Sequence, residues 1–150
     1  MWDAGIERTR EEELASSILE ALREKLNREY CFERAPFIVR DAIASIIEHF
    51  HESEFSITAL KRELRIRSHT FERLFGEAAG LTPWEFMTTA RLSGAIVMIG
   101  MCVPLKNIHA YAGFKSSRNF IRSTRSIFGH SPGYIRDHFE EVTGIPIDRA

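Results

Sequence analysis

Two stretches of this chain follow one pattern: FERLFGEAAGLTP at residues 71–83 and FIRSTRSIFGHSP at residues 120–132. Each begins with Phe-x-Arg and ends with Gly, one further residue, Ser or Thr, and Pro, and the second copy starts 49 residues after the first. A glycine readily supplies the left-handed residue that ends a helix, and Ser or Thr followed by Pro is typical of a helix start. The pattern therefore predicts a duplicated unit, in which a short Arg-bearing helix stops at a glycine and another helix follows.

The first Arg-bearing helix is expected from a cap at Ser68 to about residue 79. Its apolar residues recur at helical spacing and are expected to face the core: Phe71, Leu74, Phe75 and Ala78. At 100° per residue, the opposite face carries His69, Glu72, Arg73 and Gly76.

The second Arg-bearing helix is expected over residues 116–128. Its inward residues are predicted to be Phe120, Thr124 and Ile127. Three arginines at spacing i, i+4 and i+7 form one outward stripe: Arg118, Arg122 and Arg125. The outward face of the first copy has no such stripe, so we expect the second copy to bind phosphate more strongly.

The rest of the chain is also patterned for helices, and runs that alternate polar and apolar residues over a strand's length are absent. We therefore expect an all-α fold: two helix-turn-helix units joined by a long linker helix, with an additional N-terminal helix. The N-terminal helix should begin at a capping box, Thr9 to Glu12, and reach about residue 29. Further helices are expected at about 37–51, 56–64, 104–112 and from 131 onward.

The linker helix has the clearest start signal in the chain, Thr82-Pro83-Trp84-Glu85, which combines a cap, a first-turn proline and a capping-box glutamate. It is expected to run to about Ile99 and to end at Gly100. Seventeen residues span ~25 Å, enough to hold two small units apart at a fixed distance.

Charge is distributed unevenly along the chain. The net charge is −1, but residues 1–55 carry −6 and residues 56–138 carry +7. The positive charge coincides with the duplicated segment, as phosphate binding requires. No apolar run reaches the ~18 to 20 residues of a membrane span, and Cys31 and Cys102 are isolated. A cytoplasmic, reduced protein without membrane contact is expected.

A set of residues spread over about 37–139 carries a resemblance to a known family. They are Phe71-x-Arg73-x-Phe75 with Gly80-Leu81-Thr82-Pro83, Arg91-Leu92-x-x-Ala95, Ile108, Gly113-Phe114, Phe120-x-Arg122, and Phe128-Gly129-His130-Ser131-Pro132 with Tyr134. In order and spacing this region resembles the DNA-binding domain of the AraC/XylS family of bacterial transcription regulators. The resemblance implies a sequence-specific regulator whose two recognition helices enter two adjacent major-groove segments, and a location on the nucleoid when bound.

By motif position, the resemblance implies DNA contacts from His69, Glu72 and Arg73 in the first unit and from Ser117, Arg118, Ile121 and Arg122 in the second. Arg125 extends the second set along its stripe. These residue types suit base reading, because Arg can hold O6 and N7 of guanine, a carboxylate can accept from cytosine N4, and an aliphatic side chain can contact the thymine methyl.

Four departures from the family pattern leave an alternative open. Lys61 and His109 stand where the family usually has Ala, so each either reaches out to solvent along the apolar surface or keeps the two helices of its unit apart. Thr124 replaces an aromatic residue and Gly76 a basic one. An alternative function, a protein-interaction module that no longer binds DNA specifically, is favoured by Glu72, Gly76, Lys61 and Thr124.

Outside the duplicated segment, residues 1–35 are expected to form an acidic helical extension, 36–140 the DNA-binding domain, and 141–150 a tail. The extension has an apolar stripe four residues apart: Leu14, Ile18, Leu22 and Leu26. It serves either dimerisation or signalling, or it packs back on the domain. The expected partners are double-stranded DNA, RNA polymerase and a second copy of the chain. The chain is read either as a stand-alone regulator or as the C-terminal part of a larger one.

No enzyme or cofactor motif is present, and no catalytic residue is expected. His49-Phe50-His51-Glu52 resembles a fragment of a metal site, but neighbouring helix positions do not share a face, so no zinc site is expected.

Overall fold

The structure, a computed structural model, describes residues 4–30, 32–67 and 69–147, and within them it contains nine helices and no strand. The expected all-α class is confirmed. The helices are α1 (Ala4–Glu29), α2 (Phe37–His49), α3 (Ile57–Glu63), α4 (Thr70–Ala79), α5 (Pro83–Gly100), α6 (Leu105–Ala112), α7 (Ser117–Phe128), α8 (Pro132–Asp137) and α9 (Phe139–Thr143). No helix in these ranges is long and apolar enough to cross a membrane. The predicted cap at Ser68 falls outside the described residues.

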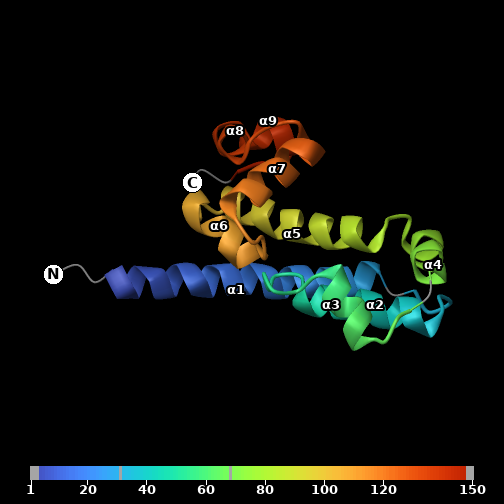
Figure 1. Cartoon of the computed structure of the whole chain (residues 1–150). Helices are drawn as coiled ribbons and strands as arrows, with labels where there is room; N and C mark the ends of the chain where they lie inside the picture. Colours follow the sequence, from blue (N-terminus) through green and yellow to red (C-terminus); the bar gives the residue numbers. More distant parts are fainter. Residues whose placement is uncertain (1–3, 31, 68, 148–150) are drawn as a thin grey trace.

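Two long helices, α1 and α5, lie side by side and organise the molecule (Figure 1). Helices α2, α3 and α4 gather toward the start of α5, and α6 to α9 gather toward its end. The two helix-turn-helix units, α3–α4 and α6–α7, are therefore carried by opposite halves of the same helix.

The start of α5 is as the sequence predicted. The Thr82 hydroxyl accepts from the Glu85 backbone N–H at 3.1 Å, and the Glu85 carboxylate accepts from the Thr82 N–H at 3.4 Å. Pro83 occupies the first turn, where its missing N–H costs nothing.

Burial of α5 is more extensive than that of a spacer between two units. It packs against α1, α2, α4, α6, α7 and α8, and most of its side chains are buried. A spacer exposed to solvent would show one apolar face, whereas α5 is apolar on nearly all sides. The linker is thus the central helix of the core.

Gly100 ends α5, as expected, but it does not turn the chain. It is the last residue of α5, and the chain turns two residues later, where Cys102 adopts φ 62°. What requires glycine is a close approach: a Cβ at position 100 would lie 2.6 Å from the Phe139 ring. Tertiary packing, not helix termination, explains this residue.

Helix α1 begins at Ala4, so the predicted capping box at Thr9 is wrong, since the backbone there is already helical. The helix packs back on the domain, which was one of the two expectations for it, and buries Ala15, Ile18, Leu19 and Leu26. Gly94 lets α5 approach closely, because a Cβ there would lie 3.3 Å from Leu19.

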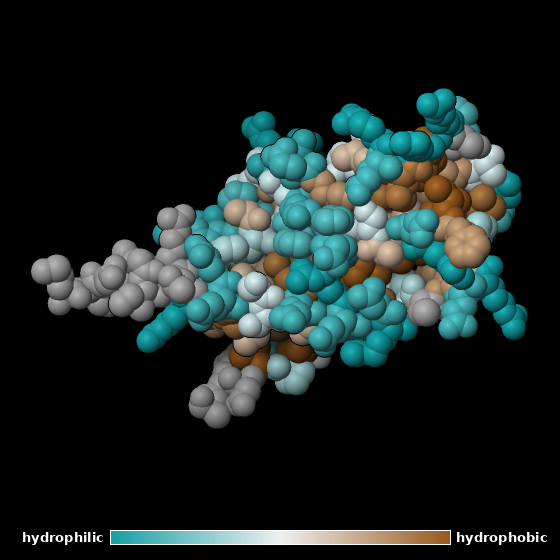
Figure 2. All heavy atoms as spheres, turned by 90° about the horizontal axis from the view of Figure 1, so that it is seen from below, coloured by the Kyte–Doolittle hydropathy of each residue, from teal (hydrophilic) through white to brown (hydrophobic). Residues whose placement is uncertain are grey.

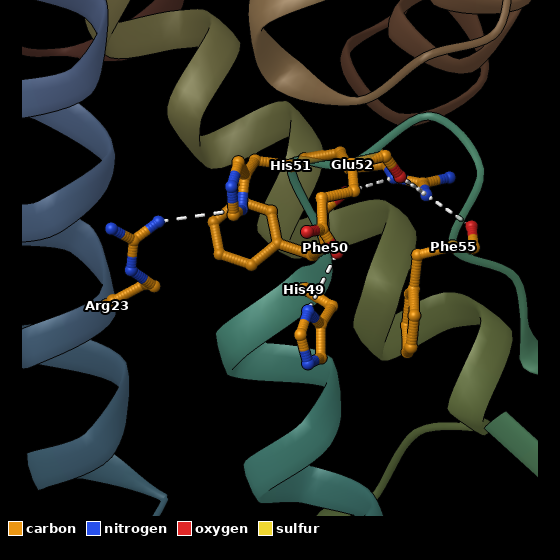
Figure 3. Close-up of polar contacts among 7 residues, drawn as sticks. Arg23, His49, Phe50, His51, Glu52 and Phe55 are labelled. Atoms are coloured by element: carbon orange, nitrogen blue, oxygen red, sulfur yellow. Dashed lines mark hydrogen bonds and ion pairs between the residues drawn. The ribbon is translucent and has the colours of Figure 1, made fainter. Parts of the chain in front are cut away.

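Polar contacts fix α1 to the second unit and to the turn after α2. Near its start, Glu11 accepts from Asn107 Nδ2 at 2.9 and 3.0 Å and from the Tyr111 hydroxyl at 3.2 Å, both on α6. Farther along, Arg23 Nη1 lies 3.5 Å from Nδ1 of His51, which follows α2 (Figure 3). Helix α1 therefore links the second unit to the turn after α2.

The turn after α2 is held by Arg91, a buried arginine of α5. Its guanidinium donates to the backbone carbonyls of Phe50 at 2.6 Å, Glu52 at 3.2 Å and Phe55 at 2.7 Å. Burial lowers the pKa of Arg91 to about 10, which leaves it charged at neutral pH. Gly113 of the second unit also touches this turn, since a Cβ there would lie 2.3 Å from the Phe50 carbonyl oxygen.

An apolar groove of about 680 Å³ runs between α1 and α5, and Leu14, Leu22 and Val97 are among the residues that line it. Figure 2 shows the molecule from below, where hydrophilic side chains cover most of the surface and hydrophobic ones gather toward the end away from the N-terminus.

Candidate nucleic-acid interface

The first helix-turn-helix unit is built from α3 and α4. Ser56 caps α3 by accepting from the Ala59 N–H at 3.0 Å. The chain turns through Arg65, whose φ of 55° is left-handed. Helix α4 buries Phe71 and Phe75 and is closed by Gly80 at φ 74°. The inward face and the glycine stop are as predicted.

The second unit repeats this plan with α6 and α7. Its turn passes through Gly113 at φ 99°, the counterpart of Arg65 in the first unit. Ser116 caps α7 by accepting from the Asn119 N–H at 3.1 Å, and Gly129 closes the helix at φ 74°. Both turns thus use a left-handed residue, but only the second unit has glycine there, where such a φ costs least.

Two inward residues of α7 have different outcomes. Thr124 is fully buried, and its hydroxyl donates to the Phe120 carbonyl at 2.7 Å, so a polar atom is accommodated where an aromatic ring is usual. The prediction that Ile127 is buried is wrong: it is 53% exposed. In this last turn the neighbouring Phe128 packs against the core instead.

The outward face of α7 is open to solvent. The five second-unit residues proposed to contact DNA are all exposed: Ser117, Arg118, Ile121, Arg122 and Arg125. No ion pair among the described residues involves the three arginines of this stripe. The α7 surface therefore presents three uncompensated positive charges at helical spacing, as a phosphate-rich ligand requires.

The outward face of α4 is different, because its charges are paired within the protein. His69 is exposed just before the helix. The Glu72 carboxylate forms an ion pair with Lys61 of α3, and Arg73 Nη1 lies 2.9 Å from Oε1 of Glu77. Sequence reasoning missed both pairings. The second could have been found from its i, i+4 spacing, whereas the first joins two helices across a turn.

Lys61 on α3 and His109 on α6, which both depart from the family pattern, lie in different surroundings. Lys61 reaches outward, as one of the two expectations had it, and its ammonium lies 5.9 Å from the centre of the Phe71 ring. His109 is half-buried, and its Nδ1 is buried without a hydrogen-bond partner among the described residues.

A stack of three rings follows α7. His130, Tyr134 and His138 lie with successive ring centres 4.3 and 4.1 Å apart and nearly parallel. The expected single last helix is broken here into α8 and α9, with His138 at φ −128° between them.

Helices α4 and α7 lie in opposite halves of the molecule. They lie toward the two ends of α5, whose eighteen residues span ~27 Å (Figure 1). That length is close to one turn of B-DNA, ~34 Å, the usual spacing of two major-groove contacts on one face. The structure thus has one short helix with an outward face toward each end of α5.

Comparison with known proteins agrees with this geometry. A family model described as a helix-turn-helix domain matches residues 60–146, more than half of the chain. The chain belongs to the AraC-type helix-turn-helix family. This family is a class of DNA-binding transcription regulators and not of enzymes. The AraC-type match begins in α3 and continues beyond α9, so it includes both units and α5.

Two individual proteins are similar to this AraC-type chain, one in sequence and one in structure. The HTH-type transcriptional regulator YtdP of Bacillus subtilis is 28% identical over 99 residues, which are 65% of this chain and 13% of that protein. The chain thus spans about an eighth of that relative's length. The C-terminal domain of AraT, a response regulator from Geobacillus stearothermophilus, superposes with a TM-score of 0.64 at 22% identity, covering 69% of this chain and 87% of that one. That likeness concerns the fold.

Proposed function

We propose that the protein is a sequence-specific transcription regulator that reads two adjacent major-groove segments of one duplex, the first with α4 and the second with α7. The observation that carries the proposal is the duplication itself. Two helix-turn-helix units, each with a second helix closed by a glycine at φ 74°, stand on opposite halves of one buried helix. A chain with two dissimilar units suits a site with two dissimilar halves.

In this proposal the second unit supplies most of the affinity. Arg118, Arg122 and Arg125 contact guanine edges or phosphates, Ser117 contacts the backbone near the start of α7, and Ile121 contacts a thymine methyl. The first unit contributes His69, Glu72 and Arg73, and the charges of Glu72 and Arg73 are already balanced within the protein. Its contribution is selectivity more than attraction.

The remaining assignments belong to the same proposal. Residues 36–140 form the DNA-binding domain, with α1 as a brace and 141–150 as a tail. The regulator acts on the nucleoid through RNA polymerase, and the part of α1 that faces the groove toward α5 is the candidate surface for self-association. The acidic character of residues 1–55 keeps this surface away from DNA.

The first experiment selects bound sequences from random duplexes and then changes the spacing between the two preferred segments. Lengthening the DNA is preferable to lengthening α5, because an insertion in that buried helix would disturb the core of both units. Five added base pairs turn the second segment to the far side of the duplex. We expect affinity to fall toward the non-specific value, ~10³-fold or more. Unchanged affinity would show that the two units do not read one duplex together.

A second experiment tests the difference between the units. Arg122→Ala and Arg118→Ala should each weaken specific binding by ~1–3 kcal/mol and, where the arginine meets a phosphate, flatten the salt dependence by ~1. Glu72→Ala should cost less affinity. Arg28→Ala, an exposed arginine in the last turn of α1, removes the same charge away from both units and serves as control. Full affinity in both α7 variants would refute the assignment.

The second candidate function, a protein-interaction module without specific DNA binding, is favoured by one observation. Both charged outward residues of α4 are engaged in ion pairs. A wild-type chain that enriches no sequence from the random pool would make this the better function.

A further inference from the structure

We propose that Lys61 is a positioning residue for base recognition, and that the Lys61–Glu72 pair makes the first unit select a cytosine at one position of its segment. This inference rests on the function proposed above and adds to it a base identity and a residue that lies outside the recognition helix. It starts from an ion pair that the fold creates between α3 and α4.

The pair holds Glu72 in one orientation. Lys61 comes from the last turn of α3, Glu72 from the first turn of α4, and the ammonium meets Oε1 of the carboxylate. The two side chains are 34% and 41% exposed, so the contact lies at the edge of the unit, partly shielded by it. The Lys61 ammonium also lies 5.9 Å from the centre of the Phe71 ring, which limits its freedom. Oε2 of Glu72 has no hydrogen bond among the described residues.

Neutralisation lets this carboxylate approach DNA. A lone negative charge on a recognition helix is repelled by the phosphates, whereas a carboxylate paired with an ammonium adds no net charge. The neighbouring Arg73–Glu77 pair is balanced in the same way. The outward surface of α4 can therefore enter the groove without the repulsion that Glu72 alone would cause.

Oε2 of Glu72, which Lys61 does not contact, is a hydrogen-bond acceptor, and its chemistry determines which base Glu72 can recognise. In the major groove cytosine offers the N4 amino group, a donor. Adenine also offers a donor, N6, but the N7 acceptor beside it weakens the contact with a carboxylate, and guanine, which offers only acceptors at this edge, repels the carboxylate oxygen. Thymine offers the O4 acceptor. A fixed carboxylate oxygen thus accepts best from cytosine, less well from adenine, and is disfavoured by guanine and thymine.

The second unit has no equivalent of this pair. The matching positions hold His109 and Ile121, and Ile121 is an exposed aliphatic residue. The cytosine preference should therefore appear in one segment only, and it should shift independently of the contacts that α7 makes.

The experiment measures base preference at every position of the selected duplex for the full chain and four variants. Lys61→Met keeps the apolar stem and removes the ammonium. Glu72→Gln replaces the acceptor oxygen by an amide, which suits adenine N6 and N7. Lys61→Arg keeps the positive charge at this position. Lys106→Met, an exposed lysine on α6, removes one charge from the matching helix of the second unit and serves as control.

We expect wild type to prefer cytosine at one position by about tenfold, the size of one good base contact. Lys61→Met should lose most of that preference, Lys61→Arg should keep it, and Glu72→Gln should move it toward adenine. Lys106→Met should change affinity and salt dependence but no base preference. Circular dichroism and thermal unfolding would show that all variants remain folded.

The outcomes separate this inference from the proposed function. If wild type enriches a two-segment sequence while Lys61→Met and Glu72→Gln keep every base preference, the Lys61–Glu72 inference is overturned and the proposed function stands. If wild type enriches no sequence, both are overturned. If Lys61→Met lowers affinity equally for all four bases at that position, Lys61 is a phosphate contact and the positioning role is refuted.

Discussion

Replacing Arg91 by methionine tests how the first unit is held to the core. The guanidinium donates to three backbone carbonyls in the turn after α2, at 2.6, 3.2 and 2.7 Å. Methionine keeps the apolar stem and removes every donor. The Glu52 carbonyl still accepts from the Phe55 N–H at 3.0 Å, so within the described part of the chain two buried carbonyls, those of Phe50 and Phe55, lose their donor.

The expected loss follows from these bonds. A buried acceptor left without a donor costs ~1–3 kcal/mol, and two such acceptors give ~2–6 kcal/mol. Relief from burying a charged guanidinium offsets part of it, so we expect the free energy of unfolding to fall by ~3 kcal/mol. That is a large share of the ~5–15 kcal/mol by which domains are stable.

Urea unfolding followed by circular dichroism measures this loss. Arg62→Met is the matched control, because Arg62 is exposed on α3 and its replacement should change stability by no more than ~0.5 kcal/mol. A loss below ~1 kcal/mol in Arg91→Met, with the control unchanged, would refute the claim that this arginine fixes the turn.

Three further substitutions test the turns and the brace. Arg65→Gly should raise the free energy of unfolding by ~0.5–1 kcal/mol in urea titrations, because φ 55° is costly for any residue with a Cβ, and a loss of stability would contradict this. Gly113→Ala should lower it by ~3 kcal/mol or more, since the new Cβ would lie 2.3 Å from a backbone carbonyl, whereas Gly76→Ala, with open space around it, should be neutral or stabilising. Burial, and then the nearby Arg23, lower the pKa of His51 below 6.5, so the unfolded state binds the proton first and stability should fall as pH drops through about 6.5. His51→Gln should flatten that part of the pH–stability curve, and an unchanged slope would show that His51 is not responsible.

Structural features that depend only on neighbouring residues in the sequence were predicted correctly. The capping box at Thr82 and the glycine stops at Gly80 and Gly129 depend on a few consecutive residues, and the structure contains all three. The predicted helix start at Thr9 is wrong, because a capping pattern can also occur inside a helix when the residues before it continue that helix.

Features that depend on distant residues could not be predicted. Gly100 resembles a helix stop in the sequence, but the position requires glycine because the Phe139 ring of α9 packs against it and leaves no room for a Cβ. The Lys61–Glu72 pair requires knowing the angle between two helices, and no spacing rule supplies it. The outward faces of α4 and α7 were predicted because a helical wheel needs only one helix, whereas the pairing of charges on them needs the neighbours.

The burial of α5 has a consequence for how the molecule unfolds. Helix α5 is stabilised mainly by the helices packed around it, which are α1, α2, α4, α6, α7 and α8. Once the helices around one half of α5 unfold, the rest of α5 loses much of this stabilisation. Neither unit can then open separately, because each completes the burial of the same helix. Slow amide protons in α4 and α7 should exchange only through global opening, with the same free energy in both halves. Helices α4 and α7, whose outward charges differ, are thus expected to belong to one cooperative folding unit.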